Sequence, residues 1–152
     1  MIRSRFGLAA IVAAILLASC GGRPSVTVSI ADQMVNTTLT STTETTGCTT
    51  SHGDGPFDRT VTTVRALTPV TLTVEAGQGA TRIRGWIYDI EAPRPSGGPI
   101  EEFTLPGHSG VYEPRSIVPA RTYEVVVNVA WSALITRGEV THVFRVRVEP
   151  PR

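Results

Sequence analysis

The residue types best suited to metal chemistry gather in one short segment of the chain. Cys48, His52 and Asp54 offer a thiol, an imidazole and a carboxylate. A structural zinc ion takes about four such ligands in a tetrahedral array. His108 or His142 would have to complete the set from a distant part of the sequence. A turn that carries a lone histidine is the simpler interpretation. A small-ligand or metal site at Cys48, His52 and Asp54 is the alternative.

The other candidate groups lack the neighbours that catalysis requires. The segment around Ser109 approaches the turn that exposes a hydrolase serine, but Val111 stands where that turn needs glycine. Glu101 and Glu102 are adjacent, so on a strand they would point to opposite faces. His142 falls among apolar residues, where a hydrogen-bonded core histidine is the expected role. We therefore predict no catalytic residue, no cofactor and no enzyme activity.

The start of the chain has the layout of an export signal. Arg3 and Arg5 precede the apolar run Phe6–Leu17. A charged start followed by an apolar run of this length is typical of a secretory signal peptide. The run is too short to span a bilayer, which requires about 20 apolar residues as helix.

The end of that run, Leu17-Ala18-Ser19-Cys20, resembles the lipobox at which bacterial lipoproteins are cleaved and acylated. The resemblance implies that a signal peptidase recognises Leu17, Ala18 and Ser19, and that the Cys20 sulfur accepts the lipid. Its thiolate would be the reactive form. Two acyl chains such as palmitate hold a protein stably at a membrane where one does not. The expected location is extracytoplasmic, at the cell membrane or the outer membrane. An ordinary signal peptide with a chance cysteine is the alternative.

This interpretation divides the chain into residues 1–19 as signal peptide, 20–24 as lipidated tether and 25–152 as one domain. A domain of this size can bury a hydrophobic core without stabilising disulfides or metal ions. After cleavage the chain holds 12 arginines and 13 acidic residues, without the positive charge of a nucleic-acid-binding surface. The expected partners are therefore the membrane, through the lipid on Cys20, and another envelope protein. The sequence leaves the oligomeric state open.

The remaining sequence alternates short strands with turns. Nine of the fourteen residues 37–50 are threonine, which favours extended chain. We predict a polar strand at 36–46 rather than a glycosylated stalk, because the stretch contains no proline. Residues 51–56 and 107–111 are expected turns or loops, and 92–99 is a proline-rich loop. The other predicted strands are 25–30, 59–66, 70–75, 82–90 and 101–105.

Two segments near the C-terminus predict a β-hairpin. The stretches 122–131 and 141–149 each place apolar residues on alternate positions, and we expect them to close through 132–139. Pairing Thr122 with Glu149 brings the two apolar faces together. The same register sets Glu124 opposite Arg147, a favourable charge pair. On the apolar face the expected pairs are Tyr123 with Val148, Val125 with Val146, Val127 with Phe144 and Val129 with His142.

No stretch beyond residue 20 has the apolar repeat of a helix, so we predict an all-β fold. Seven or eight short strands with frequent turns indicate an immunoglobulin-like antiparallel β-sandwich, preceded by a helical signal peptide. Trp86 on a central strand and Tyr123 at the start of a late one suit that layout. We expect both to pack in the core with Trp131, the alternative being a carbohydrate- or peptide-binding face. Cys48 is expected as a free thiol, buried or partly buried.

The stretch from Thr42 to Glu149 resembles a group of uncharacterised immunoglobulin-like lipoprotein domains. The matching segments are Cys48 with 54–56 (DGP), the valine-rich strand 70–74, and Trp131 followed by 144–148 (FRVRV). The group's hairpin usually carries a Trp-x-x-Gly turn, whereas here glycine follows only at 138. The resemblance implies the fold and the envelope location but no activity. The function we expect is a membrane-anchored, non-catalytic interaction or structural accessory module.

Overall fold

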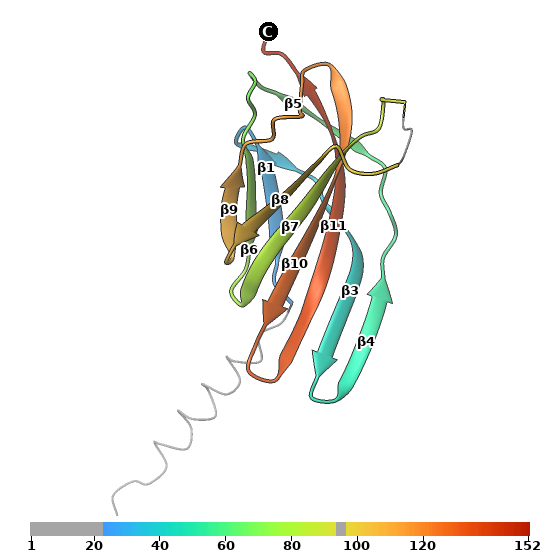
Figure 1. The fold of residues 1–152 in the computed structure, drawn as a ribbon, viewed down its shortest axis with the longest axis vertical. Coiled ribbons are helices and arrows are strands. Elements are labelled where there is room, and N and C mark those ends of the chain that lie inside the picture. The colour runs from blue at the N-terminus through green and yellow to red at the C-terminus, as the bar shows by residue number, and fades with distance from the viewer. Residues whose placement is uncertain (1–22, 94–96) are drawn as a thin grey trace, which may run out of the picture.

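The structure is a computed structural model that describes residues 23–93 and 97–152, which form strands, turns and loops (Figure 1). The predicted signal-peptidase recognition residues Leu17, Ala18 and Ser19 and the predicted lipidation site Cys20 lie outside the described residues. Part of the expected loop 92–99 lies outside them as well. Within the described ranges, no helix is long and apolar enough to cross a membrane.

The smaller sheet has four antiparallel strands in the order β2-β1-β6-β9. Alternate residues of β1 and β6 point into the core, as their period-two sequence pattern predicts. β2 and β9 were not predicted, because each is short and mostly exposed. The strands are β1 (Val26–Ile30), β2 (Gln33–Val35), β6 (Leu72–Ala76) and β9 (Ser109–Tyr112).

The larger sheet has seven strands, six of them in the order β4-β3-β11-β10-β7-β8. The seventh strand, β5, pairs in parallel with the C-terminal part of β11. It lies on the same side of β11 as β3, which pairs with the N-terminal part. The strands are β3 (Thr38–Thr46), β4 (Thr49–Asp54), β5 (Val61–Arg65), β7 (Ala80–Asp89), β8 (Glu101–Pro106), β10 (Arg121–Ser132) and β11 (Thr136–Glu149).

The two sheets pack as an immunoglobulin-like sandwich, which confirms the predicted fold class. One face has the neighbours β1-β6-β9 and the other β8-β7-β10-β11, the order expected of such a sandwich. Tyr123 near the start of β10 hydrogen-bonds to the backbone at Val118, as a tyrosine corner does. The core contains Tyr123 and Trp131, both of which were predicted to pack there.

Trp86 does not pack in the core, and this prediction was wrong. On β7 the large apolar side chains that are buried are Ile83 and Ile87, so the alternation places Trp86 on the outer face. There Trp86 is half-buried, and the Arg84 guanidinium carbon lies 5.8 Å from its ring centroid. Because large apolar residues occupy both faces of β7, periodicity alone did not separate the inner face from the outer one.

The β10–β11 hairpin is present, but its register differs by two residues from the predicted one. Tyr123 lies opposite Val146 rather than Val148, and Glu124 lies opposite Arg145 rather than Arg147. His142 therefore faces Val127. A slip of two residues keeps the same side chains on the same face, so the apolar pattern fits either register. The strands continue to Ser132 and from Thr136, which leaves a shorter turn than the 132–139 connection expected.

The threonine-rich segment is a strand, as predicted, and it continues into a second strand. β3 pairs with β4 through a turn at Gly47 and Cys48, so residues 51–54 belong to β4 and not to a turn. All six residues of β4 are exposed. Cys48 is a free, exposed cysteine, which corrects the expectation of a buried or partly buried thiol. Because the hairpin extends past the area that the smaller sheet covers, its polar residues need no apolar partner.

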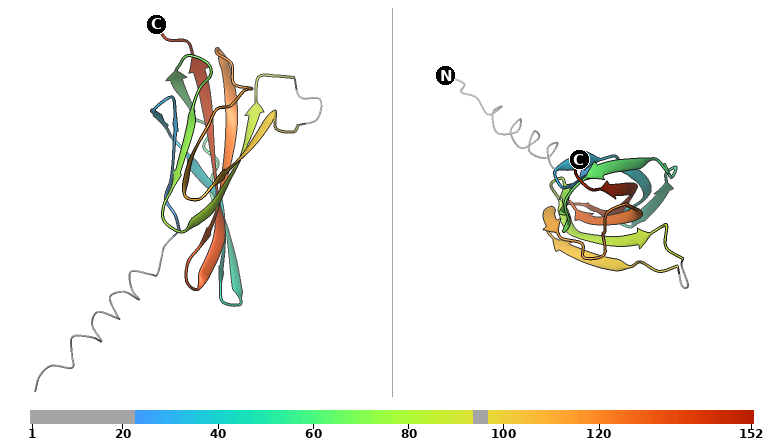
Figure 2. Two further views of the ribbon diagram at one scale, coloured as in Figure 1. Left: turned by 60° about the vertical axis from the view of Figure 1, so that its left-hand side comes forward. Right: turned by 90° about the horizontal axis from the view of Figure 1, so that it is seen from above.

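The β3–β4 and β10–β11 hairpins are the two long hairpins, and both project in the same direction beyond the other strands (Figure 2). The β10–β11 turn is closed by the Ala133 N–H, which donates to the Thr136 carbonyl at 2.7 Å. At the opposite end of β11 the chain reaches its C-terminus (Figure 1). The sandwich therefore has two distinct ends, one formed by hairpin turns and one by the loops after β5 and β9.

Candidate interaction site

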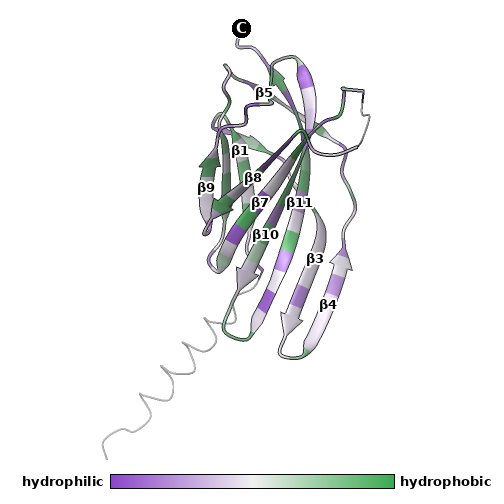
Figure 3. Cartoon of the chain, in the orientation of Figure 1, coloured by the Kyte–Doolittle hydropathy of each residue, from purple (hydrophilic) through white to green (hydrophobic). Residues whose placement is uncertain are grey.

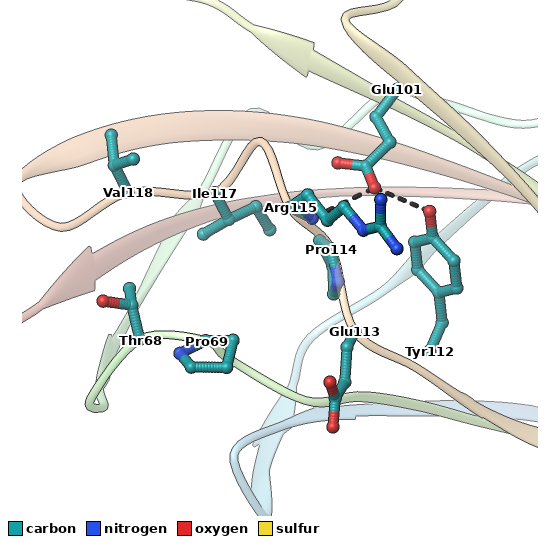
Figure 4. Close-up of a pocket in the computed structure, with 9 residues that line it drawn as sticks. All are labelled: Thr68, Pro69, Glu101, Tyr112, Glu113, Pro114, Arg115, Ile117 and Val118. Atoms are coloured by element: carbon teal, nitrogen blue, oxygen red, sulfur yellow. Dashed lines mark hydrogen bonds between the residues drawn. The ribbon is translucent and has the colours of Figure 1, made fainter.

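The loop end of the sandwich contains an open hollow of about 940 Å³, which we call the loop-end hollow. The segment after β5 forms one wall, and the β9–β10 connection forms the other (Figure 4). Glu101 at the start of β8 closes one side. The lining residues are Thr68, Pro69, Glu101, Tyr112, Glu113, Pro114, Arg115, Ile117 and Val118.

Glu101 holds the β9–β10 connection in place through its carboxylate. The Tyr112 hydroxyl donates to Oε1 at 2.6 Å, and the Arg115 N–H donates to the same oxygen at 3.0 Å. Oε2 accepts the Ser116 N–H at 2.8 Å and the Ser116 hydroxyl. Burial alone would raise the pKa of Glu101, but these donors outweigh it and hold the pKa below its ordinary value. One side chain thus orients a connection more than ten residues away in sequence.

Tyr112 is fixed by packing as well as by its hydroxyl. Its ring stacks on Phe103 with the centroids 4.7 Å apart. Phe103 lies over Gly85 of the neighbouring strand, where an added Cβ would come within 2.0 Å of the Phe103 ring. A glycine in a strand interior often marks such a close approach. Gly85 therefore provides the space in which the Phe103–Tyr112 stack supports the Glu101 carboxylate.

The other end of the same connection is held by Tyr123 and Asp89. The Tyr123 hydroxyl oxygen accepts the Val118 N–H at 2.9 Å. Asp89 forms an ion pair with Arg121 and accepts the N–H groups of Glu91 and Ala92. Burial would raise the pKa of Asp89, but these partners outweigh it and lower the pKa. Both flanks of the hollow are thus fixed by hydrogen-bonded side chains.

The hollow presents charged and apolar groups side by side. Neither Glu113 nor Arg115 forms a side-chain ion pair with another described residue. Val118 is 46% exposed at the rim, and the nearby Leu67 is 77% exposed. Apolar contact area bordered by polar groups is the usual composition of a surface that binds another protein. The loop-end hollow therefore offers both kinds of contact, charged and apolar.

The proposed metal ligands are spread along one hairpin. Cys48 lies in the β3–β4 turn, whereas His52 is four residues along, or about 13 Å at strand spacing. His52 Nδ1 lies 3.1 Å from the Thr43 hydroxyl, and Asp54 lies at the end of β4. In the described part of the chain, no group of three or more His, Cys, Asp or Glu side chains could hold a metal ion.

The remaining sequence candidates also lie apart from one another. Ser109 begins β9 instead of lying in the expected loop, and it pairs with Glu75 of β6. Glu101 is half-buried in the hollow, while Glu102 is exposed, so the predicted opposite orientation is confirmed. His142 is half-buried, and its Nδ1 lies 3.3 Å from the Thr37 hydroxyl, in keeping with a structural histidine. Burial lowers the pKa of His142, which favours the neutral ring.

Sequence reasoning did not identify the loop-end hollow. It predicted only that Glu101 and Glu102 point to opposite faces of a strand, and it assigned no role to Glu113, Arg115 or Val118. The four donors to Glu101 come from 112–116, a segment without a recognisable motif. The available signal was Gly85, an isolated glycine between Arg84 and Trp86 inside a predicted strand.

The fold defines an immunoglobulin-like β-sandwich with a hydrogen-bonded hollow at its loop end. Comparison with protein-family models, curated proteins and solved structures finds no match to this chain.

Proposed function

We propose that this protein is an exported bacterial lipoprotein whose non-catalytic sandwich binds another envelope protein. The lipid on Cys20 holds it at a membrane, and the loop-end hollow contacts the partner. The observation that carries the proposal is that the chain enters the sandwich at one end while the hollow lies at the other.

The separation of the two ends follows from β11. Arg23 forms an ion pair with Glu44, which lies opposite Gly138 near the start of β11. The hollow begins just after β5, whose last residue pairs with Glu149 at the end of β11. Glu149 is eleven residue steps along the strand from Gly138, which is about 36 Å. A chain anchored before Arg23 therefore presents the hollow away from its membrane.

The anchor is tested by replacing its nucleophile. Cys20→Ala is expected to move the protein from the membrane fraction to a soluble or unprocessed form, because no thiol remains to accept lipid. Mass spectrometry of the mature wild-type protein should find an acylated residue 20. An unmodified residue 20 in that protein would contradict the anchor.

The binding surface is tested by cross-linking in living cells. A photoreactive residue in place of Val118, at the rim of the hollow, should form a discrete protein adduct. The same residue in place of Val111, which is 60% exposed on β9, should not. Adding Arg115→Glu should abolish the Val118 adduct, because it reverses a charge beside the binding surface. Equal adducts at both positions, or an adduct insensitive to Arg115→Glu, would contradict binding at the hollow.

A further inference from the structure

The turns of the two long hairpins meet and form a single surface. The Gly47 N–H of the β3–β4 turn donates to the Ile135 carbonyl of the β10–β11 turn at 3.4 Å. The two turns therefore form one feature, which we call the hairpin tip. Its residues are Gly47, Cys48, Leu134 and Ile135.

The hairpin tip exposes apolar side chains, and none of its four residues is charged. Leu134 is 77% exposed and Ile135 is 69% exposed. The β10–β11 turn is correspondingly hydrophobic in Figure 3. Across residues 45–50 and 132–138 the only charged residue is Arg137. Apolar residues with an arginine behind them suit a lipid surface, where the apolar groups enter the acyl region and the guanidinium stays among phosphates.

The hairpin tip lies at the end of the sandwich where the chain enters. Arg23 is linked to Glu44, and Glu44 lies opposite Gly138. Gly138 is three residues from Ile135, about 10 Å at strand spacing. Cys20 is also three residues from Arg23, so the extended chain spans at most about 11 Å. A lipid on Cys20 and the hairpin tip are therefore within reach of the same membrane surface.

We propose that the hairpin tip inserts Leu134 and Ile135 into the bilayer that holds the lipid on Cys20. This inference rests on the proposed anchor. The second contact restricts the tilt of the sandwich, because a single point of attachment alone leaves the domain free to rotate. The tip and the tether together hold β11 upright, with the loop-end hollow facing away from the membrane.

Cys48 makes the proposal testable in the full-length, acylated protein. An environment-sensitive fluorophore on the Cys48 thiol reports from the hairpin tip, while acylation blocks the Cys20 thiol. The matched control is Leu67→Cys in a Cys48→Ser background, because Leu67 is as exposed as Leu134 but follows β5 at the loop end. Both proteins are reconstituted into phosphatidylcholine–phosphatidylglycerol vesicles.

We expect the Cys48 probe to shift to shorter wavelength and to be quenched by lipids that carry nitroxides on their acyl chains. Quenching by aqueous iodide should be about threefold weaker at the Cys48 probe than at the Leu67→Cys probe. Replacing Leu134→Ser and Ile135→Ser together should make the Cys48 probe as accessible to iodide as the control, with the protein still on the vesicles.

The possible outcomes distinguish membrane insertion of the hairpin tip from anchoring by the lipid on Cys20. A protein that sediments with vesicles but keeps a water-exposed Cys48 probe overturns insertion and leaves the anchor intact. A wild-type protein that fails to sediment overturns the anchor and the tip together. A Cys48 probe that stays lipid-quenched after the double serine replacement also overturns insertion by Leu134 and Ile135.

Discussion

The Tyr123 hydroxyl oxygen lies 2.9 Å from the Val118 backbone nitrogen and accepts its hydrogen bond. The same hydroxyl lies 3.3 Å from the Val118 carbonyl oxygen, to which it can donate. One side chain thus satisfies the backbone of a loop that has no strand partner. Through this contact the start of strand β10 positions the rim of the loop-end hollow.

Tyr123→Phe should destabilise the protein by about 1–3 kcal/mol, because the Val118 N–H loses its partner in a partly buried place. Urea unfolding followed by circular dichroism would measure the loss. The ring stays in the core, so the strand content of the folded state should not change. A variant as stable as the wild type would show that the Val118 hydrogen bond does not contribute.

Glu101→Gln should destabilise the protein by a similar amount, about 1–3 kcal/mol near neutral pH. An amide replaces one acceptor oxygen with a donor, which then faces the N–H and hydroxyl of Ser116. Glu102→Gln is the matched control, since Glu102 is exposed on the opposite face of the same strand. The control should stay within about 0.5 kcal/mol of the wild type.

The Glu101 contribution should also depend on pH in one direction. Its pKa is lower in the folded state than the ordinary 4.5, so the folded state binds the proton more weakly than the unfolded state. Its stabilisation is therefore present above pH 4.5 and is lost as the pH falls through the folded pKa. The stability gap between wild type and Glu101→Gln should narrow over that range. A constant gap would contradict the shifted pKa of Glu101.

Gly85→Ala should destabilise the sandwich by about 1–3 kcal/mol, because the new Cβ collides with the Phe103 ring. Gly98→Ala is the control, since an added Cβ there meets no heavy atom within 4 Å. Combining Gly85→Ala with Phe103→Leu should recover part of the loss by removing the ring. Thermal unfolding of the four proteins, wild type included, would test this, and equal melting temperatures for the two alanine variants would contradict it.

The observed hairpin register predicts which arginine couples to Glu124. Arg145 Nη2 lies 2.8 Å from the Glu124 carboxylate, and both side chains are mostly buried. Arg147 instead contacts Glu91 and Glu149. A double-mutant cycle of glutamine replacements should give about 0.5–1 kcal/mol for Glu124 with Arg145, and a value within error of zero for Glu124 with Arg147. The reverse result would support the register shifted by two residues.

The register also illustrates what sequence patterns can resolve. The alternating valines of 122–131 predicted the hairpin and its buried face correctly. They could not fix the pairing, because a two-residue slip changes neither face, and either Arg145 or Arg147 satisfies Glu124. The turn decided the register, and its sequence carries no strong turn signal. The mixed apolar residues around Trp86 likewise left its face ambiguous.

The hollow was harder to predict than the fold. A strand can be predicted from the pattern of residues next to one another in the sequence. The role of Glu101 depends on donors from 112–116, which tertiary packing brings to it. For Cys48, His52 and Asp54 the sequence indicated a grouping that the structure does not contain. Closeness in sequence made a shared metal site the alternative interpretation, but Cys48 lies in the β3–β4 turn and His52 and Asp54 lie along the extended strand β4.

The two sheets differ in their number of strands, and this difference determines which part of the protein unfolds locally first. β4 is an edge strand whose six residues are all exposed, so little apolar burial opposes its detachment. Its backbone amides should exchange with deuterium well before those of β7, which lies between two strands of the larger sheet. Local unfolding of β4 can therefore occur while the valine-rich core stays packed, so this edge of the sheet can open without global unfolding.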